Sequence, residues 1–415
     1  MKENENLINH PVPKDQRIGW KAPLINFLGC NIALSELMVG GALITGMSVS
    51  GLISAAIIGN LILIVVATIQ GNIAAREGLN TYVLATGAFG KKGGVWMISL
   101  LLGFTSFGWF GIQAGVAGLS IQQIFPSVNL TLAIIVLGLL MMIVAVYGFS
   151  LMAKFNAIAL PPLILLMVYG LYKAFSVDNS IAISDYQPLA ENAISLLDGI
   201  NLVVGVVIVG AVISPDYLRY TRNVKDVAII AVVGIGFISF VQQLSAGIMA
   251  INSPTWDITA VMANLGMGWG AFLILLLAAW STNLSNAYSG GLALKNIFPS
   301  VSRSTLTLVA GLIGTALAAS GLIFKFQMFL SVLSIAVPAV AGVMWAEYYL
   351  IQGKTFVQRE GFNWYAIAAW VLGFIVSMLS NKFNLGLPPV NAIIVSGLAY
   401  WLIMTRVPTA KVQPQ

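Results

Sequence analysis

One long apolar segment with polar residues at its centre limits what this chain can fold into. Residues 20–47 are apolar over a length that exceeds the ~20 residues of helix needed to cross a bilayer. Yet Gly29 and Asn31 lie near the middle of this segment, and Ser35 and Glu36 follow one turn later. Because a carboxylate at membrane depth costs at least ~2.5 kcal/mol, Glu36 is expected to face protein or water.

A glycine beside polar residues at this depth predicts a helix that breaks near Gly29 and exposes backbone carbonyls. Such breaks are tolerated in membranes only where they are packed in protein or line a cavity. In secondary transporters, interrupted helices hold the substrate and the coupling ion. A kinked but continuous helix, with Glu36 reaching toward the interface, is the alternative that this segment leaves open.

The composition indicates an integral membrane protein of the all-α class. The chain is 59% hydrophobic and only 8% charged, whereas soluble domains carry ~25% charged residues. Its apolar runs are much longer than the ~10-residue alternating segments of an outer-membrane barrel. A single cysteine (Cys30) and a single histidine (His10) exclude an internal disulfide and any cysteine-cluster or histidine metal site in the membrane. No cofactor other than a coupling ion is expected.

Several functional classes are disfavoured by missing motifs. The chain contains no phosphate-binding P-loop, so an ATP-driven pump is not expected. It contains neither HExxH nor GxSxG, and its polar residues form no recognisable catalytic set, which argues against a membrane-embedded enzyme. No removable signal peptide is expected at the N-terminus. The net charge of +6 is explained by membrane topology rather than by nucleic-acid binding.

Hydropathy predicts about twelve transmembrane helices in one domain. The expected spans are residues 20–47, 50–75, 93–123, 130–149, 151–175, 196–221, 226–251, 268–295, 304–321, 326–348, 362–381 and 388–405. Two longer connections, residues 80–90 and 253–265, look amphipathic, and residues 176–194 form a polar external loop.

The lysines and arginines give the orientation. With the N-terminus in the cytoplasm, only Lys173, Lys325 and Lys382 of the 20 basic residues fall outside. Cytoplasmic loops of membrane proteins carry an excess of Lys and Arg. We therefore expect a multi-pass protein of the inner (cytoplasmic) membrane with both termini in the cytoplasm.

A second interrupted span suggests an internal repeat. In residues 196–221, Gly205 and Gly210 lie mid-membrane and Pro215 lies near the inner end. This span comes five spans after the first, and paired interruptions in two halves indicate the binding site of a transporter. Frequent glycines in membrane helices are the simpler explanation. The expected organisation is an N-terminal tail, two inverted repeats, two added helices and a C-terminal tail, over residues 1–19, 20–175, 196–348, 362–405 and 406–415.

The third span carries a polar and aromatic face. Ser106, Trp109 and Gln113 lie at i, i+3 and i+7, so they share one side of a helix. An indole offers a stacking face, and a carboxamide offers both a donor and an acceptor. This pair suits a flat polar ligand, although packing of Trp109 and local bonding of Gln113 would explain it as well.

The eighth span is rich in oxygen-bearing side chains. Ser281, Thr282 and Ser285 are weak evidence because such hydroxyls often bond to their own helix. Asn283 and Asn286 are stronger evidence, since each must satisfy a side-chain amide in an apolar setting. Their spacing allows both amides to face one cavity.

Together these motifs resemble the nucleobase:cation symporter-1 family, and within it the bacterial cytosine permeases. The resemblance runs over most of the chain and rests on Pro11-Val12-Pro13 with Arg17, Phe89-Gly90, Gly108-Trp109-Phe110-Gly111, Asp216-Tyr217-Leu218-Arg219-Tyr220 with Arg222-Asn223, and Trp280-Ser281-Thr282-Asn283. It implies a fold of five plus five inverted-repeat helices with two additional C-terminal helices. It also implies uptake of nucleobases or related flat heterocycles with sodium or protons.

The resemblance assigns roles to individual residues. The substrate would stack on Trp109 and meet a wall formed by Ser106, Gln113, Val206, Val207, Val209, Gly210, Asn283 and Asn286. A sodium ion would use the carbonyls of Gly29, Ala33 and Ala278 and the hydroxyls of Ser281 and Thr282. Gln113 matches a glutamine that the hydantoin transporters of the family place four residues after this tryptophan.

Some positions depart from the cytosine permeases. Those proteins tend to carry glutamine at the position of Ser106, an aromatic residue near Val207 and at Ala33, and serine near Val209. Glu36 is also unusual and is a candidate for carrying a coupling proton.

The function expected from these observations is sodium-coupled import of a nucleobase, with cytosine as the first candidate. Proton coupling, another planar heterocycle (purine, hydantoin, allantoin or a pyrimidine vitamin precursor) and a channel are the alternatives. No nucleic acid and no protein partner are expected.

Overall fold

The computed structural model describes residues 10–146, 149–176 and 182–407, and within these ranges the chain is helical. The membrane part consists of α1 (Lys21–Asn31), α2 (Leu34–Gly46), α3 (Val49–Glu77), α5 (Lys91–Ile124), α6 (Leu130–Ala145), α7 (Phe149–Ser176), α8 (Leu196–Val212), α10 (Val224–Ala231), η5 (Val232–Phe237), α11 (Ile238–Ala250), α13 (Trp269–Ile297), α14 (Arg303–Ala319), α15 (Phe326–Ala336), α16 (Pro338–Trp345), η7 (Ala346–Ile351), α17 (Trp364–Phe383) and α18 (Pro388–Arg406). Short helices join them: η2 (Lys14–Gln16), α4 (Thr81–Phe89), η3 (Ile183–Asp185), η4 (Ala190–Asn192), α9 (Pro215–Leu218), α12 (Ile258–Asn264) and η6 (Leu322–Lys325).

The helices match the predicted spans. Among the described residues, eight helices are long and apolar enough to cross a membrane. Four shorter apolar helices, α2, α6, α8 and α14, occupy the first, fourth, sixth and ninth predicted spans. The predicted all-α membrane class is therefore confirmed. The two amphipathic connections fold into the short helices α4 and α12.

Apolar stripes on the outer helices identify the lipid-facing surface. On α3, Ile57, Leu61 and Val65 follow one another at intervals of four residues, and each is about half exposed. On α18, Ile394 and Leu398 repeat the pattern. Residues four apart lie on one helical face. These helix faces point away from the protein core and toward lipid. This explains why they are hydrophobic although no other helix packs against them.

The first span is interrupted as predicted, but at a different residue. Helix α1 ends at Asn31 and α2 begins at Leu34, while Ile32 and Ala33 have extended backbone with ψ of 91° and 152°. Gly29, where the sequence predicted the break, is still helical. The alternative of a kinked but continuous helix is excluded by these dihedral angles.

The sixth span is interrupted near its end rather than at its central glycines. Helix α8 runs through Gly205 and Gly210 to Val212, and the short helix α9 begins at Pro215. Gly205 serves close packing instead, because a Cβ there would lie 2.3 Å from the Leu330 carbonyl oxygen of α15.

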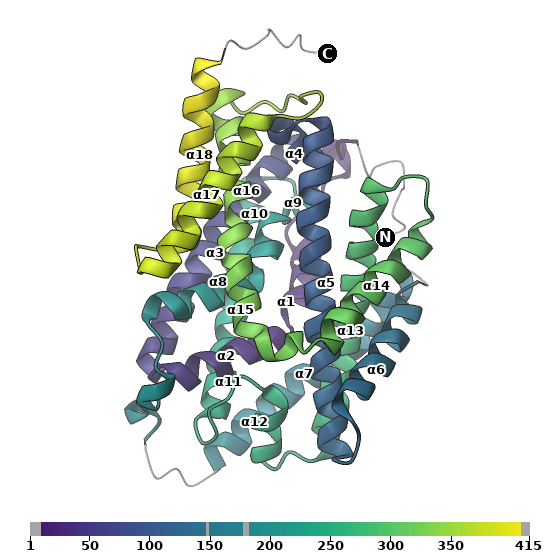
Figure 1. Cartoon of the computed structure of the whole chain (residues 1–415), viewed down its shortest axis with the longest axis vertical. Helices are drawn as coiled ribbons and strands as arrows, with labels where there is room; N and C mark the ends of the chain where they lie inside the picture. The colour runs from purple at the N-terminus through teal and green to yellow at the C-terminus, as the bar shows by residue number, and fades with distance from the viewer. Residues whose placement is uncertain (1–9, 147–148, 177–181, 408–415) are drawn as a thin grey trace.

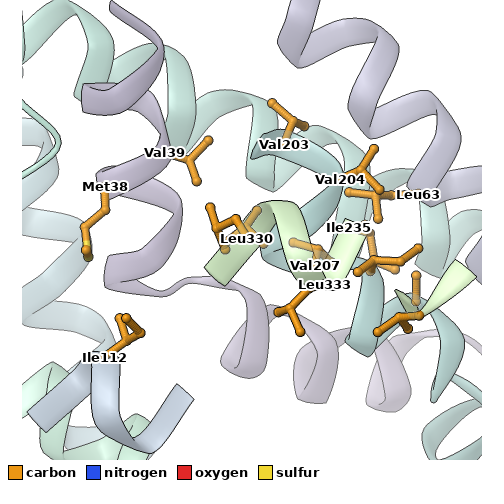
Figure 2. Close-up of a cluster of buried hydrophobic side chains, with 14 of the residues drawn as sticks. Met38, Val39, Leu63, Ile112, Val203, Val204, Val207, Ile235, Leu330 and Leu333 are labelled. Atoms are coloured by element: carbon orange, nitrogen blue, oxygen red, sulfur yellow. The ribbon is translucent and has the colours of Figure 1, made fainter. Parts of the chain in front are cut away.

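The helices pack around a central apolar core. In Figure 1, α4 and α9 lie toward the end from which α18 leads to the C-terminus, and α12 lies at the opposite end. Figure 2 shows apolar side chains of α2, α8 and α15 converging, with Leu330 and Leu333 beside Val207. This core fixes α8 against α15 and so positions one wall of the site described below.

The described part of the N-terminal segment is packed rather than a free tail. The Val12 N–H donates to the Gly78 carbonyl at 2.9 Å, and the Ile18 N–H donates to the Tyr220 carbonyl at 2.7 Å. The guanidinium of Arg17 is buried and donates to the Val12 and Ala75 carbonyls. Residues 10–19 therefore connect the end of α3 with the region after α9. Residues 1–9 and 408–415 of the expected tails lie outside the described residues.

Candidate functional site

A cavity of about 280 Å³ lies beside the break between α1 and α2. Its walls come from α1, α5, α7, α8 and α13, which are distant in the sequence. All of the predicted substrate residues except Asn283 line it, namely Ser106, Trp109, Gln113, Val206, Val207, Val209, Gly210 and Asn286. The tertiary structure thus brings the interrupted first span together with the polar faces of the third and eighth spans.

Trp109 has two aromatic neighbours on α15. Its ring centroid lies 5.3 Å from that of Phe329 and 6.4 Å from that of Phe326, both in edge-to-face geometry. Neither aromatic contact is a parallel stack, and Trp109 also lines the cavity. The indole is therefore held in place by α15 while it contributes to the cavity wall.

Gln113 is the most unusual polar residue of the site. It lies one turn after Trp109 on α5, is fully buried and lines the same cavity. Within the described ranges, neither its Oε1 nor its Nε2 has a hydrogen-bond partner. A buried amide without partners is costly, so a buried donor and acceptor at a cavity wall favour a polar ligand that would satisfy both.

Asn283 does not reach the cavity, contrary to the predicted substrate contact. It is fully buried behind the wall, where its Nδ2 donates to the Phe110 carbonyl at 3.0 Å. Its Oδ1 accepts from Nδ2 of Asn286 at 3.2 Å, and Asn286 itself lines the cavity. Asn283 therefore joins α13 to α5 and orients Asn286. Helical spacing could not decide this, because both faces of α13 meet other helices.

The residues predicted to bind a cation are mostly together. Ala33, Ala278, Ser281 and Thr282 all line the cavity where the α1–α2 break faces α13. The predicted contribution of the Gly29 carbonyl stays a prediction. The Thr282 hydroxyl donates to the Ala278 carbonyl at 3.1 Å, which is the bond to its own helix that the sequence left open. Hydroxyl and carbonyl oxygens from two elements suit a monovalent cation. The described residues contain no cluster of three or more carboxylate, cysteine or histidine side chains.

Glu36 lies beside the break but not in the cavity. It is buried in the first turn of α2, where its Oε1 accepts from the Ser239 hydroxyl at 2.7 Å and its Oε2 accepts from Nε2 of Gln243 at 2.7 Å. Gln243 in turn accepts from Nδ2 of Asn60 at 3.0 Å. Glu36 therefore faces protein, as expected, and no sequence pattern had pointed to its partners in the seventh span.

The cavity extends toward α4 and α9, where the sequence analysis assigned no site residues. Tyr82, Asp216 and Tyr217 line that end. Asp216 accepts from the Thr81 N–H at 2.8 Å, so it binds the first turn of α4. Toward α12, Trp256 lies 6.3 Å from Phe326, which also contacts Trp109. Aromatic contacts thus lead from Trp109 at the cavity wall to Trp256, just before α12.

Comparison with known proteins assigns this architecture to a family. The sequence profile described as "Permease for cytosine/purines, uracil, thiamine, allantoin" matches residues 11–403. The chain belongs to this family. It is a membrane transporter rather than an enzyme, and the permeases of this family are described as acting on nucleobases and related small molecules. The resemblance inferred from the motifs is confirmed.

A curated relative and two solved structures support the assignment. The cytosine permease of Escherichia coli (strain K12) is 32% identical over 413 residues, which cover 97% of this chain and 95% of the relative. The inward-facing conformation of Mhp1 matches with a TM-score of 0.83 at 21% identity, over 96% of this permease and 94% of that chain. The closed conformation of Mhp1 with bromovinylhydantoin bound matches with a TM-score of 0.78 at 20% identity, over 97% and 96% of the two chains. The permease therefore has the Mhp1 transporter fold.

Proposed function

We propose that this permease imports a nucleobase, with cytosine as the first candidate, by sodium-coupled symport. The observation that carries the proposal is the pairing of Trp109 with Gln113 at one cavity wall. The indole provides a surface for stacking a flat ring. The carboxamide provides an adjacent donor and acceptor that have no partner within the described residues. A nucleobase presents the complementary features, namely a flat ring with neighbouring N–H and carbonyl groups at its edge.

The wall formed by α8 is aliphatic, and this favours a second candidate. Val206, Val207 and Val209 line the cavity where a second aromatic ring was expected from the cytosine permeases. Gln113 lines the cavity while Asn283 is turned away. This arrangement resembles the glutamine-containing pocket that the sequence suggested for hydantoin transporters, and a hydantoin was bound to Mhp1. A hydantoin or allantoin is therefore the alternative substrate.

The cation would be held by oxygens of two elements. Ala278, Ser281 and Thr282 of α13 line the cavity together with Ala33 at the α1–α2 break. Helix ends leave backbone carbonyls without intrahelical donors, so the break supplies ligands that a continuous helix would not. A bound sodium ion would attract the oxygens of both α13 and the α1–α2 break, and its positive charge would so hold these two elements together. Mhp1 is described as a nucleobase-cation-symport-1 family transporter, which supports cation coupling. Proton coupling is the alternative.

Transport would follow alternating access. The cavity reaches Tyr82 and Asp216 at the α4 and α9 end, and aromatic contacts lead from its wall toward α12 on the opposite side. With the predicted orientation in the inner membrane, this arrangement corresponds to an inward-facing state. Two inverted repeats, residues 20–175 and 196–348, would provide the paired interrupted spans, and rocking of one bundle against the other would alternate the access.

A radiolabelled uptake assay in cells or proteoliposomes tests the proposal. We expect saturable cytosine uptake that requires an inward sodium gradient and is competed by unlabelled cytosine. Hydantoin and allantoin serve as competitors for the alternative substrate. Uptake that saturates only with hydantoin or allantoin would identify the second candidate. Uptake driven equally well by a proton gradient in choline buffer would exclude sodium coupling, and flux that does not saturate would indicate a channel.

A further inference from the structure

A glutamine of α11 bridges the break in the first span. Gln242 is almost completely buried, and its carboxamide bonds to the backbone on both sides of the break. Its Oε1 accepts from the Ala33 N–H at 3.1 Å, and its Nε2 donates to the Asn31 carbonyl at 2.9 Å. One side chain, more than 200 residues away in the sequence, thus replaces helical bonds that are lost between α1 and α2.

The bonds to Gln242 determine which backbone groups remain available. The last regular bond of α1 joins the Ile32 N–H to the Leu28 carbonyl at 2.9 Å. In a continuous helix, the next bond would join the Ala33 N–H to the Gly29 carbonyl. Because Gln242 accepts the Ala33 N–H instead, the Gly29 carbonyl loses this donor. Gly29 is one of the residues predicted to bind the cation through its carbonyl. The bond to Gln242 therefore gives the Ala33 N–H an acceptor and leaves the Gly29 carbonyl available to the cation.

The rest of the seventh span holds the same region in place. The Gly234 carbonyl of η5 accepts from Nδ2 of Asn31 at 2.8 Å. Ser239 and Gln243 of α11 bind the carboxylate of Glu36, one turn into α2. The end of α1 and the start of α2 are therefore fixed to one neighbouring span, which presents Gln242 to the break between them.

We propose that Gln242 is a positioning residue for the cation site. It keeps the backbone between Asn31 and Ala33 extended, and so keeps the Gly29 carbonyl out of the helical bonding pattern. Without the side-chain amide, the Ala33 N–H is free to bond to Gly29, and the segment loses the geometry that binds the ion. This inference rests on the sodium coupling proposed above, and it adds a residue that does not itself touch the ion.

Sodium-dependent stabilisation of the purified permease tests this inference without any substrate. A ligand at concentration L that binds only the folded protein stabilises it by RT ln(1 + L/Kd), so the melting temperature rises with the logarithm of ligand concentration over dissociation constant. Thermal unfolding is measured in sodium chloride and in choline chloride at equal ionic strength, over a sodium titration. The variants are Gln242→Met, which keeps side-chain length without hydrogen bonds, and Gln242→Glu, which keeps the acceptor for the Ala33 N–H. Gln70→Met is the control, since it removes a fully buried amide of α3 that donates to the Val212 carbonyl, away from the break.

We expect Gln242→Met to need about tenfold more sodium than the wild type for the same rise in melting temperature, which corresponds to ~1.4 kcal/mol of sodium affinity. Gln242→Glu should fall between this variant and the wild type, and Gln70→Met should keep the wild-type sodium response. If Gln242→Met does not fold, the sodium response of Gln242→Glu decides whether Gln242 positions the cation site.

Two results would overturn the inference, and they are distinguishable. If the wild type is stabilised by sodium and the Gln242 variants respond equally, Gln242 has no positioning role, while the proposed sodium coupling stands. If the wild type itself responds identically to sodium and choline, both the sodium coupling and the inference are wrong.

Discussion

The side-chain amide of Asn283 donates to the Phe110 carbonyl at 3.0 Å, and this bond joins α13 to α5 directly behind the cavity wall. Phe110 follows Trp109, so the bond fixes the turn of α5 that carries the indole. Asn283 also accepts from Asn286, which lines the cavity. One buried residue thus couples the helix that carries Trp109 and Gln113 to the helix that carries Ser281 and Thr282.

Gln113→Ala should weaken substrate affinity more than Asn283→Ala does. Gln113 lines the cavity and has no hydrogen-bond partner among the described residues, whereas Asn283 is bonded away from the cavity. Asn283→Ala should instead lower the free energy of unfolding by about 0.6–2 kcal/mol, the range for interhelical bonds in membrane proteins. Isothermal titration with cytosine and thermal unfolding separate the two effects. A larger affinity loss in a stably folded Asn283→Ala protein would contradict this assignment.

Trp109→Ala should reduce the affinity for any flat aromatic substrate. Stacking of a base on an aromatic side chain contributes ~1–3 kcal/mol, so the dissociation constant should rise by roughly 5- to 150-fold. Trp109→Phe should retain part of the affinity, and Phe329→Leu is a control for the packing behind the indole. Equilibrium binding to folded protein is the measurement. Unchanged affinity in Trp109→Ala would exclude a stacking role.

Thr282→Ala should abolish the sodium dependence of substrate affinity. Its hydroxyl lines the cavity, although it also donates to the Ala278 carbonyl. Thr315→Ala is a matched control, because Thr315 makes the same type of bond to the Gly311 carbonyl at 2.8 Å and does not line this cavity. Substrate affinity is measured in sodium and in choline buffer. Equal sodium dependence in both variants would mean that the Thr282 hydroxyl serves only its own helix.

Glu36→Gln should destabilise the permease without changing the pH dependence of sodium-driven uptake. Both carboxylate oxygens accept hydrogen bonds, from Ser239 and Gln243, and a carboxamide would place a second donor against one of them. The loss of a buried hydrogen bond that leaves its partner unsatisfied costs roughly 1–3 kcal/mol. Thermal unfolding measures the loss, and uptake across a pH series tests coupling. A pH dependence that disappears in Glu36→Gln would instead identify Glu36 as a proton-carrying group.

Accessibility of single cysteines should establish the orientation. With Cys30 replaced by alanine, Ser184→Cys places a thiol in the connection between α7 and α8, and Glu360→Cys places one between η7 and α17. Both native residues are exposed. We expect a membrane-impermeant maleimide to label Ser184→Cys in intact spheroplasts and Glu360→Cys only after permeabilisation. The reverse pattern would invert the topology derived from the charges.

Local sequence patterns determined the class, the spans and the candidate walls of the site. Hydropathy and length are sufficient for the spans, because each apolar helix must satisfy its backbone internally in lipid. The spacing of Ser106, Trp109 and Gln113 placed them on one face of α5, and all three line the cavity. The polar residues between Gly29 and Glu36 indicated an interrupted helix, which is present.

The tertiary structure decided the exact break and the direction of each polar side chain. The break falls at Ile32 and Ala33 rather than at Gly29, because the side chain of Gln242, on a distant span, accepts a hydrogen bond from the Ala33 N–H. Asn283 is turned away from the cavity because the Phe110 carbonyl of α5 accepts its amide hydrogen. Helical periodicity assigns residues to faces, but every face of a central helix meets another helix. Only the positions of those neighbours determine which polar group finds a protein partner and which remains available for a ligand.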